Sequence, residues 1–119
     1  MNKTVRFLSL TLLILLLLSL VACTPSLDRI EETLREEEYL VRRFGAGGSD
    51  AVDLPDNVAG RISATGPKGE YLTVLLFESK QDAEVYYTAI KKDYTLSRHA
   101  IREGKVVMYG TRTAVALFE

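Results

Sequence analysis

The feature that most constrains this chain is a nearly unbroken apolar run from Phe7 to Leu20, which shortly precedes the only cysteine. Lys3 and Arg6 give the run a positive start, and Leu20-Val21-Ala22-Cys23 follows at its end. The run has about 14 residues, fewer than the ~20 that a permanent transmembrane helix needs. A positive start, a short apolar stretch and a small residue at its end are typical of a cleaved export signal. We therefore predict that residues 1–22 are a signal peptide.

Cys23 needs an explanation, because exported proteins usually pair their cysteines and this chain has one. Leu20-Val21-Ala22-Cys23 resembles the lipobox of bacterial lipoproteins. The resemblance implies a diacylglyceryl group on the Cys23 sulfur and cleavage between Ala22 and Cys23. Two acyl chains hold a protein on a bilayer far better than one. There are two alternatives. The segment could be a plain secretory signal, or it could be an uncleaved membrane anchor that is followed by a cysteine without a function.

The expected organisation is a signal peptide at 1–22, a lipidated cysteine with a short tether at 23–26, and one α+β domain at 27–119. Removal of residues 1–22 takes away two of the 15 basic residues and none of the 16 acidic ones, so the remainder carries a formal charge of −3. A mildly acidic, exported domain has no general attraction to nucleic acid. We expect a lipid-anchored protein on the extracytoplasmic side of the cell membrane or envelope, with the membrane as its first partner.

The first half of the domain predicts one helix and three strands. Leu27, Ile30 and Leu34 form a helical stripe within residues 26–37. Residues 39–44 favour a strand, although one continuous helix is an alternative because no Gly or Pro separates the two. Residues 61–65 predict a weak edge strand, followed by a turn at 66–69. Residues 70–77 alternate with apolar side chains on both faces, which indicates a central strand covered on both sides.

The second half predicts a helix from Ser79 with its apolar stripe running to Tyr94, a strand at 105–109 and a short C-terminal helix capped near Thr111. Residues 96–103 either extend the helix or connect loosely. Because a helix joins the strands at 70–77 and 105–109, we expect these strands to run parallel. The predicted fold is α+β: a small mixed sheet of about four strands packed with helices, in the order α-β-β-β-α-β-α.

Residues that carry chemistry are sparse, and we assign no catalytic residue, metal or cofactor. His99 is the only histidine, and Ser97 two positions away does not face it on a helix. Asp50, Asp53 and Asp56 lie in one loop, but their spacing does not match a calcium loop. The glycines that begin at Gly45 lack the phosphate-loop pattern. We read all these residues as structural or solvated.

Three sets of side chains could form surfaces, although each has a simpler structural interpretation. The acidic residues at 31–38 are most simply a solvated helix face. The tyrosines of the second helix are most simply core residues. Scattered surface charge is the simpler reading of a third set, the basic residues Arg42, Arg43, Lys91, Lys92, Arg98 and Arg102.

The mature chain also resembles small uncharacterised lipoproteins of Gram-positive bacteria. Residues 78–87 and 106–114 carry this resemblance, which concerns a helix cap, packing aromatics and a strand-to-helix turn and implies no activity. From the anchor, the short tether and the missing catalytic groups we expect a non-enzymatic binding or accessory module, with an envelope or membrane protein as neighbour. The alternatives are a lipid or small-ligand carrier and, less favoured, a small envelope hydrolase.

Overall fold

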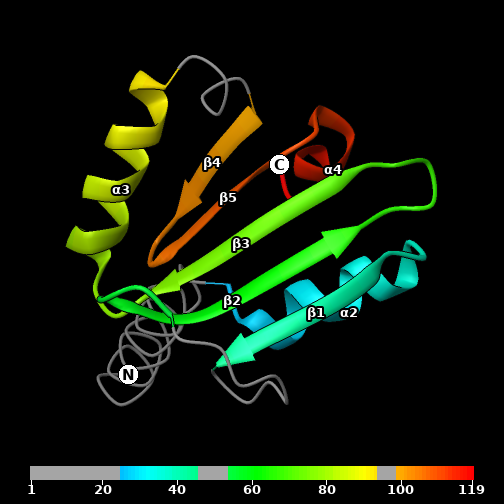
Figure 1. Cartoon of the computed structure of the whole chain (residues 1–119), viewed down its shortest axis with the longest axis horizontal. Coiled ribbons are helices and arrows are strands. Elements are labelled where there is room, and N and C mark those ends of the chain that lie inside the picture. Colours follow the sequence, from blue (N-terminus) through cyan, green and yellow to red (C-terminus); the bar gives the residue numbers. More distant parts are fainter. Residues whose placement is uncertain (1–24, 46–53, 94–98) are drawn as a thin grey trace, which may run out of the picture.

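The computed structural model describes residues 25–45, 54–93 and 99–119, which form one antiparallel sheet with helices on both faces (Figure 1). The sheet has five strands in the order β1-β2-β3-β5-β4. This confirms the α+β class and the predicted order of elements, with five strands where about four were expected. The elements are α2 (Leu27–Glu36), β1 (Leu40–Gly45), β2 (Val58–Thr65), β3 (Tyr71–Phe77), α3 (Lys80–Lys92), β4 (Ala100–Glu103), β5 (Val106–Gly110) and α4 (Arg112–Ala116).

Helix α2 begins and ends as its local sequence dictates. The Ser26 side chain accepts a hydrogen bond from the backbone N–H of Arg29 at 3.2 Å, which caps the helix. The predicted stripe of Leu27, Ile30 and Leu34 is buried. Glu38 adopts a φ of 65°, and this left-handed residue turns the chain into β1. The alternative of one continuous helix is therefore wrong.

Strand β2 lies inside the sheet and not at its edge, contrary to our expectation. It pairs with β1 from Leu40↔Thr65 to Gly45↔Gly60 and with β3 on its other side. The Arg61–Thr65 stretch looks weak in isolation because small and polar residues alternate there with Ile62 and Ala64. The predicted turn that follows is confirmed, with Gly69 at a φ of +83° that suits glycine.

The connection after β3 differs most from prediction. Helix α3 is capped at Ser79, whose Oγ accepts from the backbone N–H of Asp82 at 3.1 Å, as expected. The segment after it contains the unpredicted β4. Strand β5 therefore pairs antiparallel with β3, and the expected parallel pairing is wrong. Strand β4 does run in the same direction as β3, with β5 between them, which is a split β-α-β arrangement.

Each face of the sheet has its own apolar core. Helices α2 and α4 cover one face, where Leu34, Ile62 and Val74 are fully buried. Helix α3 covers part of the other face, over β3, β4 and β5, where Ala83 and Val107 are fully buried. In Figure 1 this second face is turned toward the viewer, and no described helix crosses β1 or β2 on it.

Helix α4 follows β5 directly and closes the first core with the buried Ala114 and Val115. Thr111 precedes the helix as expected, but its hydroxyl makes no cap hydrogen bond. The hydroxyl instead lies 3.3 Å from both the backbone nitrogen and the carbonyl oxygen of Tyr71, so it extends the pairing of β5 with β3.

Candidate functional site

The most distinctive polar feature lies on the sheet face that α3 covers only in part. We call Phe44, Arg61, Tyr86 and Tyr109 the arginine–aromatic cluster. Phe44 pairs with Arg61 across β1 and β2, so both side chains lie on the same face. Tyr109 reaches that face from β5, and Tyr86 reaches it from α3. Strand register and one helix therefore bring together residues that are far apart in sequence.

Arg61 is the centre of the cluster. Its guanidinium carbon lies 5.8 Å from the centroid of the Phe44 ring, a cation–π distance. Its Nε atom is shielded from solvent and has no hydrogen-bond partner among the described residues. A buried donor without a partner costs about 1–3 kcal/mol. The residue as a whole stays partly exposed, so solvent reaches other parts of the side chain.

Tyr86 forms the helix side of the cluster. Its ring packs on Phe77 of β3 at a centroid distance of 5.2 Å. Burial raises the pKa of Tyr86 to about 12, the adjacent phenol of Tyr109 adds to the rise, and the charge of Arg61 partly offsets it. The hydroxyl of Tyr86 is therefore a neutral donor at physiological pH, close to both Tyr109 and Arg61.

The charged side chains that the described strands place on this sheet face are basic. Strand alternation places Arg42, Arg61 and Arg102 there, and no Asp or Glu of the five described strands shares the face. Arg42 lies 5.3 Å from the centroid of the same Phe44 ring that Arg61 contacts. Arg102 donates to the carbonyl oxygen of Gly104 at 3.2 Å. The single acidic strand residue, Glu103, points to the opposite face.

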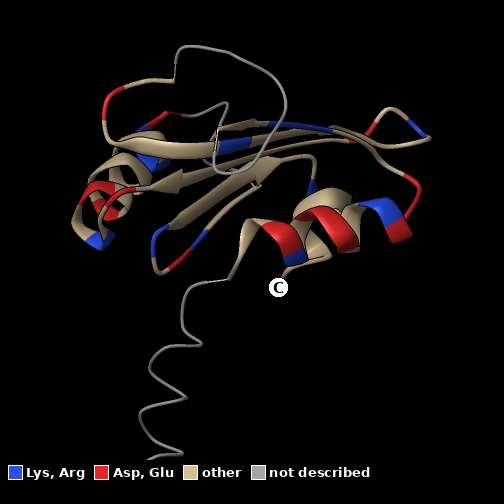
Figure 2. Cartoon of the chain, turned by 90° about the horizontal axis from the view of Figure 1, so that it is seen from below, with Lys and Arg blue, Asp and Glu red and all other residues tan. Residues whose placement is uncertain are grey.

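The helices carry their charge differently from this sheet face. In Figure 2 acidic and basic stretches alternate along α2, which lies on the other side of the sheet. Arg43, the neighbour of Arg42, also points to that side and pairs with Glu31 and Asp28 of α2. The predicted set of basic residues is therefore divided between two faces, and it does not form one patch.

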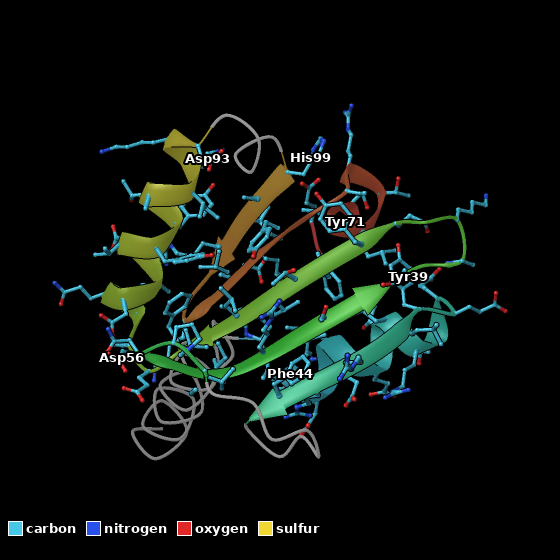
Figure 3. The ribbon with its side chains drawn as sticks, in the orientation of Figure 1. Tyr39, Phe44, Asp56, Tyr71, Asp93 and His99 are labelled. Carbon is cyan, nitrogen blue, oxygen red and sulfur yellow. The ribbon has the colours of Figure 1, made fainter. Side chains whose placement is uncertain are left out.

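His99 lies at the end of the molecule where α3 ends, together with Asp93, and Asp56 lies at the opposite end of α3 (Figure 3). An open pocket of about 610 Å³ adjoins His99, Arg112 and Glu119, with the buried Val115 at its wall. Ser97, the proposed neighbour of His99, lies outside the described residues. His99 therefore lies beside polar residues, and we identify no catalytic partner for it among the described residues that line the pocket.

Several predicted residues lie outside the described part of the chain. These are the lipidation and cleavage residues Cys23 and Ala22, and also Asp50, Asp53, Tyr94 and Arg98. Asp56 is exposed, and Asn57 beside it adopts a φ of 71° in the turn before β2. Within the described ranges no three His, Cys, Asp or Glu side chains are grouped as a metal site would require.

The tyrosines of α3 have the core role that their spacing indicates. Tyr86 and Tyr87 are half-buried and pack against the second apolar core. Among residues 25–45, 54–93 and 99–119, no helix has the length and apolar character needed to cross a membrane.

Sequence reasoning missed Arg61 and Phe44 as a pair. The usable signal was the alternation in Arg61-Ile62-Ser63-Ala64, which places Arg61 and Ser63 on one face of a strand. Which residue lies beside Arg61 depends on the pairing of β2 with β1, and the local sequence does not encode this pairing.

Comparisons with known proteins return no matching family model, no matching curated protein and no matching solved structure.

Proposed function

We propose that this chain is a membrane-anchored lipoprotein whose domain, residues 27–119, is a non-enzymatic binding module on the extracytoplasmic side. The observation that carries the proposal is the segment Leu20-Val21-Ala22-Cys23 directly after the apolar run. A lone cysteine at this position provides a thiol to which lipid can be attached. The anchored domain then acts at the membrane surface.

The start of the domain supports a short tether. Ser26 already caps α2, so Thr24, Pro25 and Ser26 are the residues between Cys23 and the helix. Three extended residues span roughly 10 Å. The folded domain would therefore lie close to the lipid headgroups, with little freedom to move away from them.

The contacts of Pro25 and Ser26 support one orientation of the anchored domain. Pro25 and Ser26 line an open pocket of about 470 Å³ together with Phe77, Glu78 and Lys105. The tether thus leaves the domain beside the end of β3 and the turn between β4 and β5. The hairpin between β2 and β3, at the other end of β3, would point away from the membrane.

The arginine–aromatic cluster supports a binding role for the domain. It joins the partly exposed guanidinium of Arg61 and the half-buried phenols of Tyr86 and Tyr109 on one sheet face, beside the buried ring of Phe44. Polar groups that converge beside aromatic side chains are typical of binding sites. The partner we expect first is a protein of the membrane or envelope, because the anchor keeps the domain beside such neighbours.

Replacement of the cysteine tests the anchor. Cys23→Ser should abolish incorporation of radiolabelled palmitate and stop signal cleavage, because the acceptor thiol is gone. Thr24→Ser is the matched control, since it alters the next residue and keeps the thiol, and it should be labelled and cleaved normally. A Cys23→Ser protein that is cleaved and stays on the membrane like the unmodified protein would contradict the proposal.

The binding role needs a separate test. Cross-linking in intact cells followed by purification of the anchored protein should recover the same neighbour repeatedly. A variant with Arg61→Gln, which changes the cluster and not the anchor, should recover less of it. A protein that recovers no reproducible neighbour would count against a protein partner while leaving the lipidation result intact.

A further inference from the structure

An open pocket of about 480 Å³ lies where the β2–β3 hairpin meets the end of α2 and α4, and Figure 3 shows Tyr39 at this end of the sheet. We propose that this pocket binds an organic cation, namely an ammonium or guanidinium group on an aliphatic stem. The inference goes beyond the binding role proposed above and uses neither the lipid anchor nor the arginine–aromatic cluster. We call the site the hairpin pocket, and its walls include Glu37, Tyr39, Pro67, Lys68, Glu70 and Leu117.

Glu70 gives the hairpin pocket a carboxylate whose hydrogen-bonding capacity is only partly used. Its Oε2 atom accepts a hydrogen bond from the Tyr39 hydroxyl at 3.3 Å, while its Oε1 atom is shielded from solvent and has no partner among the described residues. A shielded acceptor without a donor costs free energy, which a donor from a ligand would recover. The terminal torsion of a glutamate is soft, so a rotation of the carboxylate turns this oxygen toward a ligand in the pocket.

Gly66 leaves the space that the Glu70 carboxylate occupies. A Cβ at position 66 would lie 2.7 Å from Oε2 of Glu70 and 3.0 Å from Cζ of Tyr39. Gly66 is not one of the glycines with a positive φ, so its backbone conformation alone does not call for glycine. The missing side chain therefore lets the carboxylate and the phenol lie together at the wall of the pocket.

Glu37 adds a second carboxylate to the hairpin pocket. Burial raises the pKa of Tyr39, and the charge and hydrogen bond of Glu70 and then the charge of Glu37 raise it further. Both carboxylates thus act on the same hydroxyl. The exposed Lys68 also lines the pocket, but none of the ion pairs among the described residues joins it to either carboxylate. Two carboxylates beside one ammonium group favour a cationic ligand.

The apolar part of the pocket indicates the body of the ligand. Pro67 lies on the hairpin, and the partly buried Leu117 packs against the first apolar core. Long basic groups lay their aliphatic stems along apolar surface and keep the charged end beside polar groups. A bare metal ion fits less well, because no three His, Cys, Asp or Glu side chains are grouped within residues 25–45, 54–93 and 99–119. This chemistry belongs both to a Lys or Arg side chain of a protein and to a free alkyl amine.

The test measures binding of simple probes to the full-length protein in mild detergent. N-acetyl-arginine amide represents a protein side chain, and 1,4-diaminobutane represents a free amine. Nuclear magnetic resonance titration, followed by the backbone amide signals of Gly66 and Glu70, should show saturable binding of at least one of them. The tighter of the two identifies the source of the ligand. N-acetyl-citrulline amide has nearly the shape of the arginine probe without its charge, and it should bind about fivefold more weakly or worse than that probe.

Variants separate the role of Glu70 from general effects. Glu70→Gln keeps the shape of the side chain and removes its charge, so it should weaken binding of the tighter cation by about fivefold or more. Gly66→Ala should also weaken binding, because the added Cβ displaces the Glu70 carboxylate. Glu84→Gln is the matched control, since it removes an exposed charge from α3, on the other side of the sheet, and it should bind normally. Thermal unfolding of each variant shows that it is folded.

Three results would overturn the proposal. The first is that neither cation saturates the unmodified protein at about 10 mM, which corresponds to negligible affinity. The second is that folded Glu70→Gln binds the tighter cation as well as the unmodified protein does. The third is that the citrulline probe binds as tightly as the arginine probe. None of these results bears on palmitate labelling at Cys23 or on the effect of Arg61→Gln, so failure of this inference and failure of the proposed function are distinguishable.

Discussion

Arg43 on β1 pairs with Glu31 on α2, with 3.5 Å between Nη1 and Oε2, and so joins the first helix to the edge strand of the sheet. The Arg43 side chain also pairs with Asp28, one helical turn earlier, and is only 14% exposed. The contact orients α2 across the first apolar core, because it fixes the helix at a point outside the buried stripe of leucine and isoleucine.

We predict that Arg43→Ala lowers the free energy of unfolding by about 2 kcal/mol, because charge-assisted hydrogen bonds from a shielded side chain are lost. Thermal unfolding by circular dichroism measures this as a fall of roughly 4–8 °C per kcal/mol. Arg35 pairs with the same Glu31 at 3.2 Å but is 59% exposed, so Arg35→Ala should cost at most about 0.5 kcal/mol. Equal losses in the two variants would contradict this ranking.

We predict that Leu34→Ala destabilises the domain by about 3 kcal/mol, because it leaves a cavity at a position with no exposed surface. Leu40→Ala makes the same chemical change where the side chain is 79% exposed, and it should alter stability by less than about 0.5 kcal/mol. Thermal unfolding of the pair checks both values. A small effect at Leu34 would mean that α2 does not pack on the sheet as described.

We predict that Gly110→Ala is among the most damaging single substitutions, with a loss of about 3 kcal/mol or more. A Cβ at this position would lie 2.1 Å from the carbonyl oxygen of Tyr71, so β5 and β3 would have to move apart. At Gly69 a Cβ would meet nothing within 4 Å, and the cost is the left-handed backbone alone, about 1 kcal/mol. A Gly110→Ala protein that melts like the Gly69→Ala protein would refute the close approach of these strands.

We predict that Tyr86 contributes stability that is lost at high pH. Its pKa rises from 10.0 to about 12 in the folded protein. Between these values the unfolded state has lost the proton that the folded state retains, so stability falls as pH increases. The contribution is complete below pH 10 and is gone once the pH passes about 12.

Ultraviolet absorbance of tyrosinate, followed against pH, should show a late transition that Tyr86→Phe removes. The same variant should flatten the fall in melting temperature between pH 10 and 12. A Tyr86→Phe protein with an unchanged titration curve and slope would show that another tyrosine is responsible.

Local signals predicted the helices well. Ser26 and Ser79 cap α2 and α3, and each side-chain oxygen accepts a hydrogen bond from the backbone N–H three residues later. Such a contact is local, so it can be predicted without knowledge of the tertiary structure. The alternating apolar residues of β3 likewise indicated a central strand. The two faces of that strand are buried by different helices, as its sequence required.

Pairing and topology were less accessible, because they depend on residues far apart in the chain. Strand β4 has four residues, too few for a periodic pattern, and missing it reversed the expected direction of β5 relative to β3. The same limitation hid the arginine–aromatic cluster. Phe44, Arg61, Tyr86 and Tyr109 come from four elements, and only the sheet register and the position of α3 bring them together.

Strand β1 is at one end of the strand order, and Arg42 and Arg43 occupy its centre with side chains on opposite faces. A strand from a second molecule that added to this edge would meet the Arg42 guanidinium on one face and the ion pair of Arg43 with Glu31 of α2 on the other. Charges at such positions discourage edge-to-edge aggregation. The two arginines thus favour a protein whose copies stay dispersed at high concentration.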